Sequence, residues 1–196
     1  MKRRIAGFVA AFAVVALLAG CSTSDGVAGS VGNGDGNYNS EDGAITKIAE
    51  ANRTEPVSFT SETTDGVAVD SKDYLGQVTV VNFWYAACPP CRVEAPDLQT
   101  LNTELSGDGV SFLGVNVRDQ AETAENFEDE FGLTYPSVID TNDGNMLLAF
   151  AGTVQPNAVP TTIVLDKKGR VAGRILGQVT EPSILKTMIT ETAEEN

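Results

Sequence analysis

A Cys-Pro-Pro-Cys motif at residues 88–91 constrains the fold more than any other feature, because of what stands on either side of it. The run Val78–Trp84 before it is β-branched and aromatic with little alternation, which predicts a strand buried on both faces of a sheet. After it, a helical stretch extends from about residue 91 to 105. The sequence therefore predicts two thiols where a buried strand gives way to the start of a helix.

The start of a helix suits thiol chemistry. Its unpaired N–H groups and partial positive charge stabilise a thiolate, which is the reactive form of cysteine. Cys88 would attack a partner's disulfide, and Cys91, on the same helical face, would attack the mixed disulfide and release the reduced partner. Pro89 and Pro90 lack N–H groups and stiffen the short loop, and we expect them to contact the substrate. The same path in reverse would oxidise a partner's dithiol.

Two other interpretations of the pair are a zinc half-site and an inert structural disulfide. A zinc site needs about four Cys, His or carboxylate ligands, whereas the chain has three cysteines and no histidine. A disulfide that closes so short a loop gains little entropy. The lack of histidine also excludes Ser-His-Asp and Cys-His catalytic units. We therefore favour a redox pair and expect no metal and no other cofactor.

Residues 56–196 are predicted to form one α/β domain, with a mixed central sheet flanked by helices. Alternation on both sides of the turn Asp65-Gly66 predicts an N-terminal β-hairpin, with strands near residues 57–60 and 67–69. Further strands are expected at 110–117, 137–140, 161–165 and 171–175, and further helices at 121–131, 146–150 and 181–192.

Residues 1–20 have a basic start and an apolar run too short for a comfortable membrane span, which predicts an export signal. The run ends in Leu18-Ala19-Gly20-Cys21, which resembles the lipobox of bacterial lipoproteins. In those signals the cysteine receives a diacylglycerol, and cleavage makes it the mature N-terminus. The resemblance implies lipidation of Cys21. The alternative is an uncleaved signal anchor with an idle thiol.

Residues 21–55 are predicted to be a lipidated, flexible tether, because residues 22–43 are rich in Gly, Ser, Asn and Asp. Residues 44–55 could form one short helical segment. Two acyl chains anchor a protein stably, so we expect the domain at the extracytoplasmic face of the cell membrane. The net charge of −14 repels phosphate backbones and makes nucleic-acid binding improbable. We expect a monomer.

The segment Val80–Pro96, VVNFWYAACPPCRVEAP, resembles the thioredoxin-like proteins of the TlpA/ResA type, in the redoxin superfamily. The likeness extends over about residues 56–190. It implies a thioredoxin-like fold with an extra N-terminal β-hairpin and a central helical insertion. It also implies the attacking role for Cys88 and the resolving role for Cys91. Pro96 matches a proline that kinks the active-site helix.

The resemblance implies further site residues. Glu94 matches a glutamate near the dithiol that assists proton movement, although it could instead be an exposed helix carboxylate. Trp84 matches an aromatic residue beside the site, with core packing as its competing role. Val159 and Pro160, before Thr161, resemble the cis-proline loop, where the backbone pairs with an extended substrate chain.

Two positions depart from related patterns. Asn82 stands where classical thioredoxins carry a buried aspartate, and asparagine cannot act as a general base. Ala87 stands where many of these proteins carry tryptophan, which we expect to leave the sulfur of Cys88 more open.

The resemblance implies an enzyme that reduces protein disulfides outside the cytoplasm. Its clients would include apocytochrome c, and its electrons would come from a membrane reductase of the CcdA/DsbD type. The alternative is a thiol oxidant acting on secreted proteins. A peroxidase is less favoured, because Tyr85 occupies the position where peroxiredoxins carry Thr or Ser. A copper-delivery protein is disfavoured by the cysteine spacing and the missing histidine.

Overall fold

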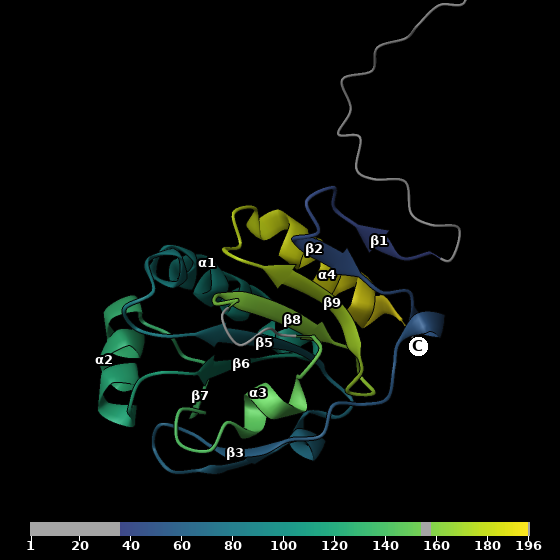
Figure 1. Ribbon diagram of the computed structural model, residues 1–196. Helices are drawn as coiled ribbons and strands as arrows, with labels where there is room; N and C mark the ends of the chain where they lie inside the picture. Colours follow the sequence, from purple (N-terminus) through teal and green to yellow (C-terminus); the bar gives the residue numbers. More distant parts are fainter. Residues whose placement is uncertain (1–35, 154–157, 196) are drawn as a thin grey trace, which may run out of the picture.

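The structure is a computed structural model that describes residues 36–153 and 158–195 (Figure 1). The predicted export signal and the lipidation of Cys21 lie outside these residues. Among the described residues, no helix has both the length and the apolar character that crossing a membrane requires.

A seven-stranded mixed sheet forms the centre of the described fold, in the order β1-β2-β9-β8-β5-β6-β7 (Figure 1). β5, β6 and β7 run parallel to one another, and the remaining pairs are antiparallel. This confirms the predicted mixed sheet. The strands are β1 (Tyr38–Asn39), β2 (Ile45–Lys47), β5 (Val78–Trp84), β6 (Val110–Asn116), β7 (Ser137–Ile139), β8 (Thr161–Leu165) and β9 (Val171–Leu176).

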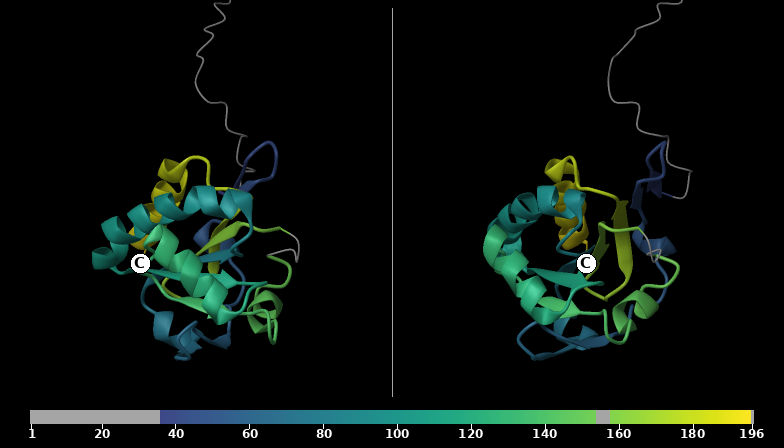
Figure 2. Two further views of the ribbon diagram at one scale, coloured as in Figure 1. Left: turned by 90° about the vertical axis from the view of Figure 1, so that its left-hand side faces the viewer. Right: turned by 60° about the vertical axis from the view of Figure 1, so that its left-hand side comes forward.

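Helices cover both faces of the sheet (Figure 2). On one face α1 and α4 bury their apolar residues against β5, β6, β8 and β9. On the other face α3 packs together with the N-terminal hairpin. Between β6 and β8, where a helical insertion was expected, the chain forms α2, β7 and α3. The helices are α1 (Pro89–Leu105), α2 (Ala121–Phe131), α3 (Asn145–Ala149) and α4 (Pro182–Glu194), with 3₁₀ turns η1 (Glu50–Asn52), η2 (Ser71–Tyr74) and η3 (Ser106–Asp108).

The predicted hairpin is confirmed as β3 (Thr60–Glu62) and β4 (Ala68–Asp70), which pair antiparallel in a sheet of their own. It also covers the outer edge of β7. Thr63 forms an isolated bridge with Val138, and the N–H of the next residue donates to the carbonyl of Ser137 at 3.0 Å. The hairpin therefore closes one edge of the main sheet.

The prediction of a tether over residues 21–55 is wrong for residues 36–55, which belong to the fold. β2 pairs with β9, placing Ile45 opposite Ile175, and β1 pairs with β2. The helical segment suggested for residues 44–55 is instead this strand followed by η1. The physical reason is that the outermost strands of a sheet, here β1 and β2, can be short and need few apolar residues. They therefore leave little trace in composition.

β5 positions the site. All seven of its residues are buried, as its unbroken apolar pattern predicts. It ends at Trp84, and a short loop leads to Cys88, the N-cap of α1. Pro89 and Pro90 then take the first two helical positions, where a missing N–H costs nothing and the fixed φ favours the helix. Pro96 lies inside the same helix.

Candidate active site around Cys88 and Cys91

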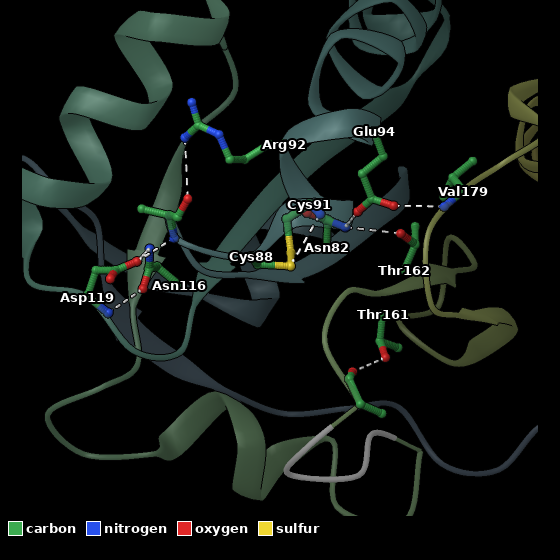
Figure 3. The surroundings of a disulfide bond; sticks show 12 residues. Asn82, Cys88, Cys91, Arg92, Glu94, Asn116, Asp119, Thr161, Thr162 and Val179 are labelled. Atoms are coloured by element: carbon green, nitrogen blue, oxygen red, sulfur yellow. Dashed lines mark hydrogen bonds between the residues drawn. A yellow bond between two sulfur atoms is a disulfide. The ribbon is translucent and has the colours of Figure 1, made fainter.

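The two cysteines form a disulfide at the start of α1, with their Cα atoms 5.2 Å apart (Figure 3). The backbone N–H of Cys91 donates to the sulfur of Cys88 at 3.2 Å. This is the contact that a thiolate at a helix N-terminus needs, because the free N–H groups of the first turn face the sulfur. The predicted placement of the dithiol is therefore confirmed.

The disulfide is recessed. Cys88 is 1% exposed and Cys91 is 2% exposed, so the expectation that Ala87 leaves the sulfur more open is wrong for the disulfide form. The reason is that Trp84 and the partly buried Val159 pack in the same apolar cluster as the two cysteines. Pro89 beside the sulfurs is exposed, and Pro90 is half-buried.

Glu94 lies one turn further along α1 and is buried, with 1% of its surface exposed. It is therefore not an exposed helix carboxylate. Its Oε1 accepts a hydrogen bond from Asn82 Nδ2 at 2.9 Å, and its Oε2 accepts one from the backbone N–H of Val179 at 2.8 Å (Figure 3). Both oxygens are thus held in place by the surrounding fold.

Burial raises the pKa of Glu94 to about 7, and the two hydrogen bonds lower it only in part. Within the described residues, no lysine or arginine forms an ion pair with this carboxyl group. Residues three apart on a helix share a face, so Glu94 lies on the same side of α1 as Cys91. A carboxyl group with this pKa can give and take a proton at neutral pH.

Asn82 explains how Glu94 is held. It lies on β5 opposite Thr162 of β8, and its Nδ2 donates to the Thr162 hydroxyl at 3.1 Å as well as to Glu94. The amide therefore uses both of its N–H groups. An aspartate at this position would face Glu94 with a second carboxylate, whereas asparagine supplies a donor.

The cis-proline loop lies where the resemblance placed it. The peptide bond between Val159 and Pro160 is cis, which confirms the expected geometry. Val159 is half-buried and packs against the cluster that contains the disulfide. The buried Pro160 accepts a hydrogen bond through its carbonyl from the N–H of Gly177 at 2.9 Å. Val159 thus lies against the same apolar cluster as the dithiol.

Trp84 lies beside the disulfide but faces inward. It is 2% exposed, and its ring stacks on Phe127 of α2 with 4.3 Å between ring centroids. In the disulfide form its position is that of a packing residue, and it offers a substrate almost no surface. Its role in substrate binding stays a prediction.

Sequence reasoning missed Asp119 and Arg92, which contact the loop before Cys88, and Asn116, which holds Asp119. Asn116 is the last residue of β6, Asp119 follows it by three positions, and Arg92 lies in the first turn of α1. The signal available in the sequence was a pair of polar residues just after a buried strand, at the same edge of the sheet as the end of β5. The partner of Asp119 and Arg92 is a backbone peptide, which no residue pattern reveals.

A thioredoxin-like sheet with a Cys-x-x-C disulfide at the start of a helix and a facing cis-proline loop defines a thiol–disulfide oxidoreductase. The Redoxin family model matches residues 50–189 of the chain. The chain therefore belongs to the redoxin family, and it is of the TlpA/ResA type.

Sequence relatives agree with this assignment. The chain is 31% identical over 132 residues to the thiol-disulfide oxidoreductase ResA of Halalkalibacterium halodurans. The matched region covers 67% of this chain and 72% of that protein. It is 37% identical over 140 residues to the thiol:disulfide interchange protein HelX of Rhodobacter capsulatus. This match covers 71% of this chain and 72% of that protein.

Solved structures agree as well. A secreted thiol-disulfide isomerase from Corynebacterium glutamicum superposes with a TM-score of 0.71 and 34% identity, over 81% of this chain and 97% of that one. A DsbF homologue from Corynebacterium diphtheriae gives a TM-score of 0.67 at 34% identity, over 76% and 92%.

Proposed function

We propose that this thiol–disulfide oxidoreductase works as a reductant of protein disulfides. The observation that carries the proposal is the composition of the first turn of α1. Pro89 and Pro90 fill its first two positions and have no N–H, so of these three positions only Cys91 donates to the sulfur of Cys88. Each lost hydrogen bond to the Cys88 thiolate makes the reduced dithiol less stable relative to the disulfide. A dithiol with few such donors therefore gives up its electrons more readily than one with several.

The catalytic steps follow from the geometry. The Cys88 thiolate attacks a sulfur of the client's disulfide, forming one S–S bond as the client's other sulfur leaves as a thiolate. Cys91 then loses its proton, attacks Cys88 and releases the second client sulfur. Glu94, on the same face of α1, is suited to take that proton because its pKa is about 7. The client chain would lie along the backbone of Val159 in an extended form.

Place and partners are part of the same proposal. Lipidation of Cys21 would hold the domain at the extracytoplasmic face of the cell membrane. The resemblance to the TlpA/ResA type supports apocytochrome c as a client and a CcdA/DsbD-type membrane protein as the electron donor. The relatives named ResA and HelX support the exchange chemistry that such a role needs.

A second candidate is oxidation or isomerisation of disulfides in secreted proteins. It is favoured by the solved structure of a secreted thiol-disulfide isomerase at 34% identity. The same two sulfurs would run the exchange in the opposite direction, so the midpoint potential decides between the two functions.

The midpoint potential of the Cys88/Cys91 couple, measured against glutathione, tests the proposal. We expect a value well below that of protein disulfide isomerase, which is about −180 mV. A value above it would overturn the reductant assignment in favour of the oxidant. Insulin reduction with Cys88→Ser as the control checks that exchange depends on the proposed attacking sulfur.

Partners and place need their own tests. Cys91→Ser should trap clients as mixed disulfides on Cys88, because the resolving sulfur is gone. Apocytochrome c among the trapped proteins is the expected result. Mass spectrometry of the membrane-bound protein should find a diacylglycerol on the thiol of an N-terminal Cys21, and an unmodified Cys21 behind an uncleaved signal would contradict the lipid anchor.

A further inference from the structure

The loop between β5 and Cys88 has one hydrogen bond within itself, from the Cys88 N–H to the Tyr85 carbonyl at 3.1 Å. It reads Tyr85-Ala86-Ala87, and the two alanines have no polar side-chain atoms. The peptide of Ala86 is nevertheless held on both sides by Asp119 and Arg92, both of which Figure 3 labels. Its N–H donates to Asp119 Oδ2 at 2.6 Å, and its carbonyl accepts from Arg92 Nη1 at 3.4 Å. Neighbouring elements therefore supply the anchors that the loop lacks.

Asp119 is itself held by the sheet. Asn116 is the last residue of β6, is fully buried and lies beside Trp84 in the parallel ladder. Its Nδ2 donates to Asp119 Oδ2 at 2.9 Å, and its Oδ1 accepts from the backbone N–H groups of Arg118 at 3.1 Å and Asp119 at 2.8 Å. The carboxylate that holds Ala86 is thus fixed to the end of a central strand.

Arg92, in the first turn of α1, makes the second contact with the peptide of Ala86. Its backbone N–H donates to the carbonyl of Cys88 at 3.1 Å. Its guanidinium lies 4.9 Å from the centroid of the Phe131 ring and forms an ion pair with Glu130 of α2. The longer distance to Ala86 makes this the weaker of the two anchors, so Asp119 is the residue to test.

We propose that Asp119 is a positioning residue for the thiol–disulfide exchange, and that it acts by holding Ala86 so that the sulfur of Cys88 stays at the start of α1. The stabilising effect of a helix N-terminus on a thiolate falls off within the first turn. The sulfur must therefore remain close to the N–H of Cys91, which is 3.2 Å away. This inference rests on exchange at Cys88 and holds whether the protein reduces or oxidises its clients.

Two variants separate position from charge. Asp119→Ala and Asp119→Asn both remove the negative charge, but only asparagine keeps an oxygen. One oxygen is enough, because Oδ2 alone accepts both the Ala86 and the Asn116 hydrogen bonds. The readout is the rate at which iodoacetamide alkylates Cys88 at pH 7 in the full chain carrying Cys91→Ser, followed on the Cys88 peptide by mass spectrometry.

We expect Asp119→Asn to alkylate within about twofold of the parent and Asp119→Ala to be about three- to tenfold slower, as small misplacements of a reacting group are costly. Equal rates for the two variants would overturn the proposal. If both were as fast as the parent, Asp119 would have no role, and if both were slow, its charge rather than its hydrogen-bonding oxygen would matter. Asp129→Ala, in an exposed acid of α2, is the charge control and should leave the rate unchanged.

Asp119→Glu covers the case in which Asp119→Ala does not fold. It keeps the charge but moves the carboxylate by one methylene, so we expect alkylation about threefold slower than the parent, on the same argument of misplacement. A rate equal to the parent's would overturn the proposal. The alkylation rate does not depend on the direction of exchange or on the client. A negative result for Asp119 would therefore not affect the proposed function, which the midpoint potential tests separately.

Discussion

Glu94 and Asp166 are two buried carboxyl groups at opposite ends of the sheet, and they titrate in opposite directions. Glu94 lies near the start of β8, is 1% exposed and has only neutral hydrogen-bond donors, so burial raises its pKa to about 7. Asp166, which follows the last residue of β8, is 4% exposed. Burial would raise its pKa, but hydrogen bonds from Arg170 and Arg53 outweigh burial and lower it.

The comparison shows that the partner, and not burial alone, decides what a buried acid does. At the redox end, an acid without a cation stays able to exchange a proton. At the other end, Arg53 joins Asp166 of the β8–β9 turn to Glu195 after α4, and so ties three distant segments together. One end is arranged for chemistry and the other for holding the fold.

The largest effect is expected when the cation is removed from the structural end. In Arg53→Met, Asp166 loses its fully buried partner and keeps only Arg170, while Glu195 loses its two hydrogen bonds from Arg53. We expect the free energy of unfolding at pH 7 to fall by about 3 kcal/mol, the lower end of the range for breaking a buried ion pair, measured by urea denaturation. The side chain of Arg53 has no exposed surface, so water cannot replace it. A loss below about 1 kcal/mol would show that the ion pairs of Arg53 do not stabilise the fold, and that they are not what distinguishes the Asp166 end of the sheet from the Glu94 end.

Removing the proton-binding group at the redox end should have a smaller, pH-dependent effect. A carboxyl whose pKa is raised in the fold stabilises it fully below its unfolded value of 4.5, and this stabilisation is lost as the pH rises through about 7. Relative to Glu94→Gln, the wild type should therefore lose up to about 3 kcal/mol between pH 5 and pH 8. Parallel stability curves for the two proteins would contradict a raised pKa.

Asp166 should show the reverse sign. Its lowered pKa stabilises the fold above the unfolded value of 3.8, and that stabilisation is lost as the pH falls through the folded value. The penalty of Arg53→Met should therefore shrink at strongly acidic pH, where Asp166 takes up a proton, while the Glu94 contribution is then fully present.

Asn82→Ala sharpens the comparison by removing a neutral donor from Glu94. The lost hydrogen bonds to Glu94 and Thr162 should cost about 1–3 kcal/mol. The pKa of Glu94 should rise further, because the Asn82 amide lowers it. Denaturation at several pH values measures both. Thr162→Val, which keeps the amide of Asn82 beside Glu94, is the matched control. An unchanged pKa of Glu94 in Asn82→Ala would contradict the role of the Asn82 amide in setting it.

The smallest effect is expected at an exposed ion pair. Lys186 and Glu104 are 2.8 Å apart, but their side chains are about half exposed, at 47% and 46%. Lys186→Met should change the free energy of unfolding by less than about 1 kcal/mol. It is the matched contrast to Arg53→Met, since each replaces a paired cation with methionine. Similar losses in the two variants would mean that burial does not set the value of an ion pair here.

Much of the fold was predictable because its signals are local. The buried pattern of residues 78–84 and the acidic amphipathic stretch 121–131 gave β5 and α2 with correct bounds. The short strand β2 was missed, because its pairing with β9 lies across the whole domain and its sequence is mostly polar. The site was predictable as far as the dithiol, and Glu94 was predictable only through the family resemblance.

The environments of the site residues could not be predicted, because they arise from contacts between distant positions. Arg53 and Asp166 are 113 positions apart, and the N–H that holds Glu94 comes from residue 179. The same is true of Asp119, whose partner is a backbone peptide 33 positions earlier. Such contacts carry no periodicity, so only the three-dimensional structure reveals them.

The bridge between Thr63 and Val138 also affects how readily the protein can aggregate. Unpaired strand edges invite foreign strands to add and aggregate. In the described part of the chain, the hairpin blocks the flank of β7, and β1 at the opposite flank has only two residues. Neither flank offers a long row of free backbone groups. The described sheet is thereby protected along both flanks against polymerising with foreign strands.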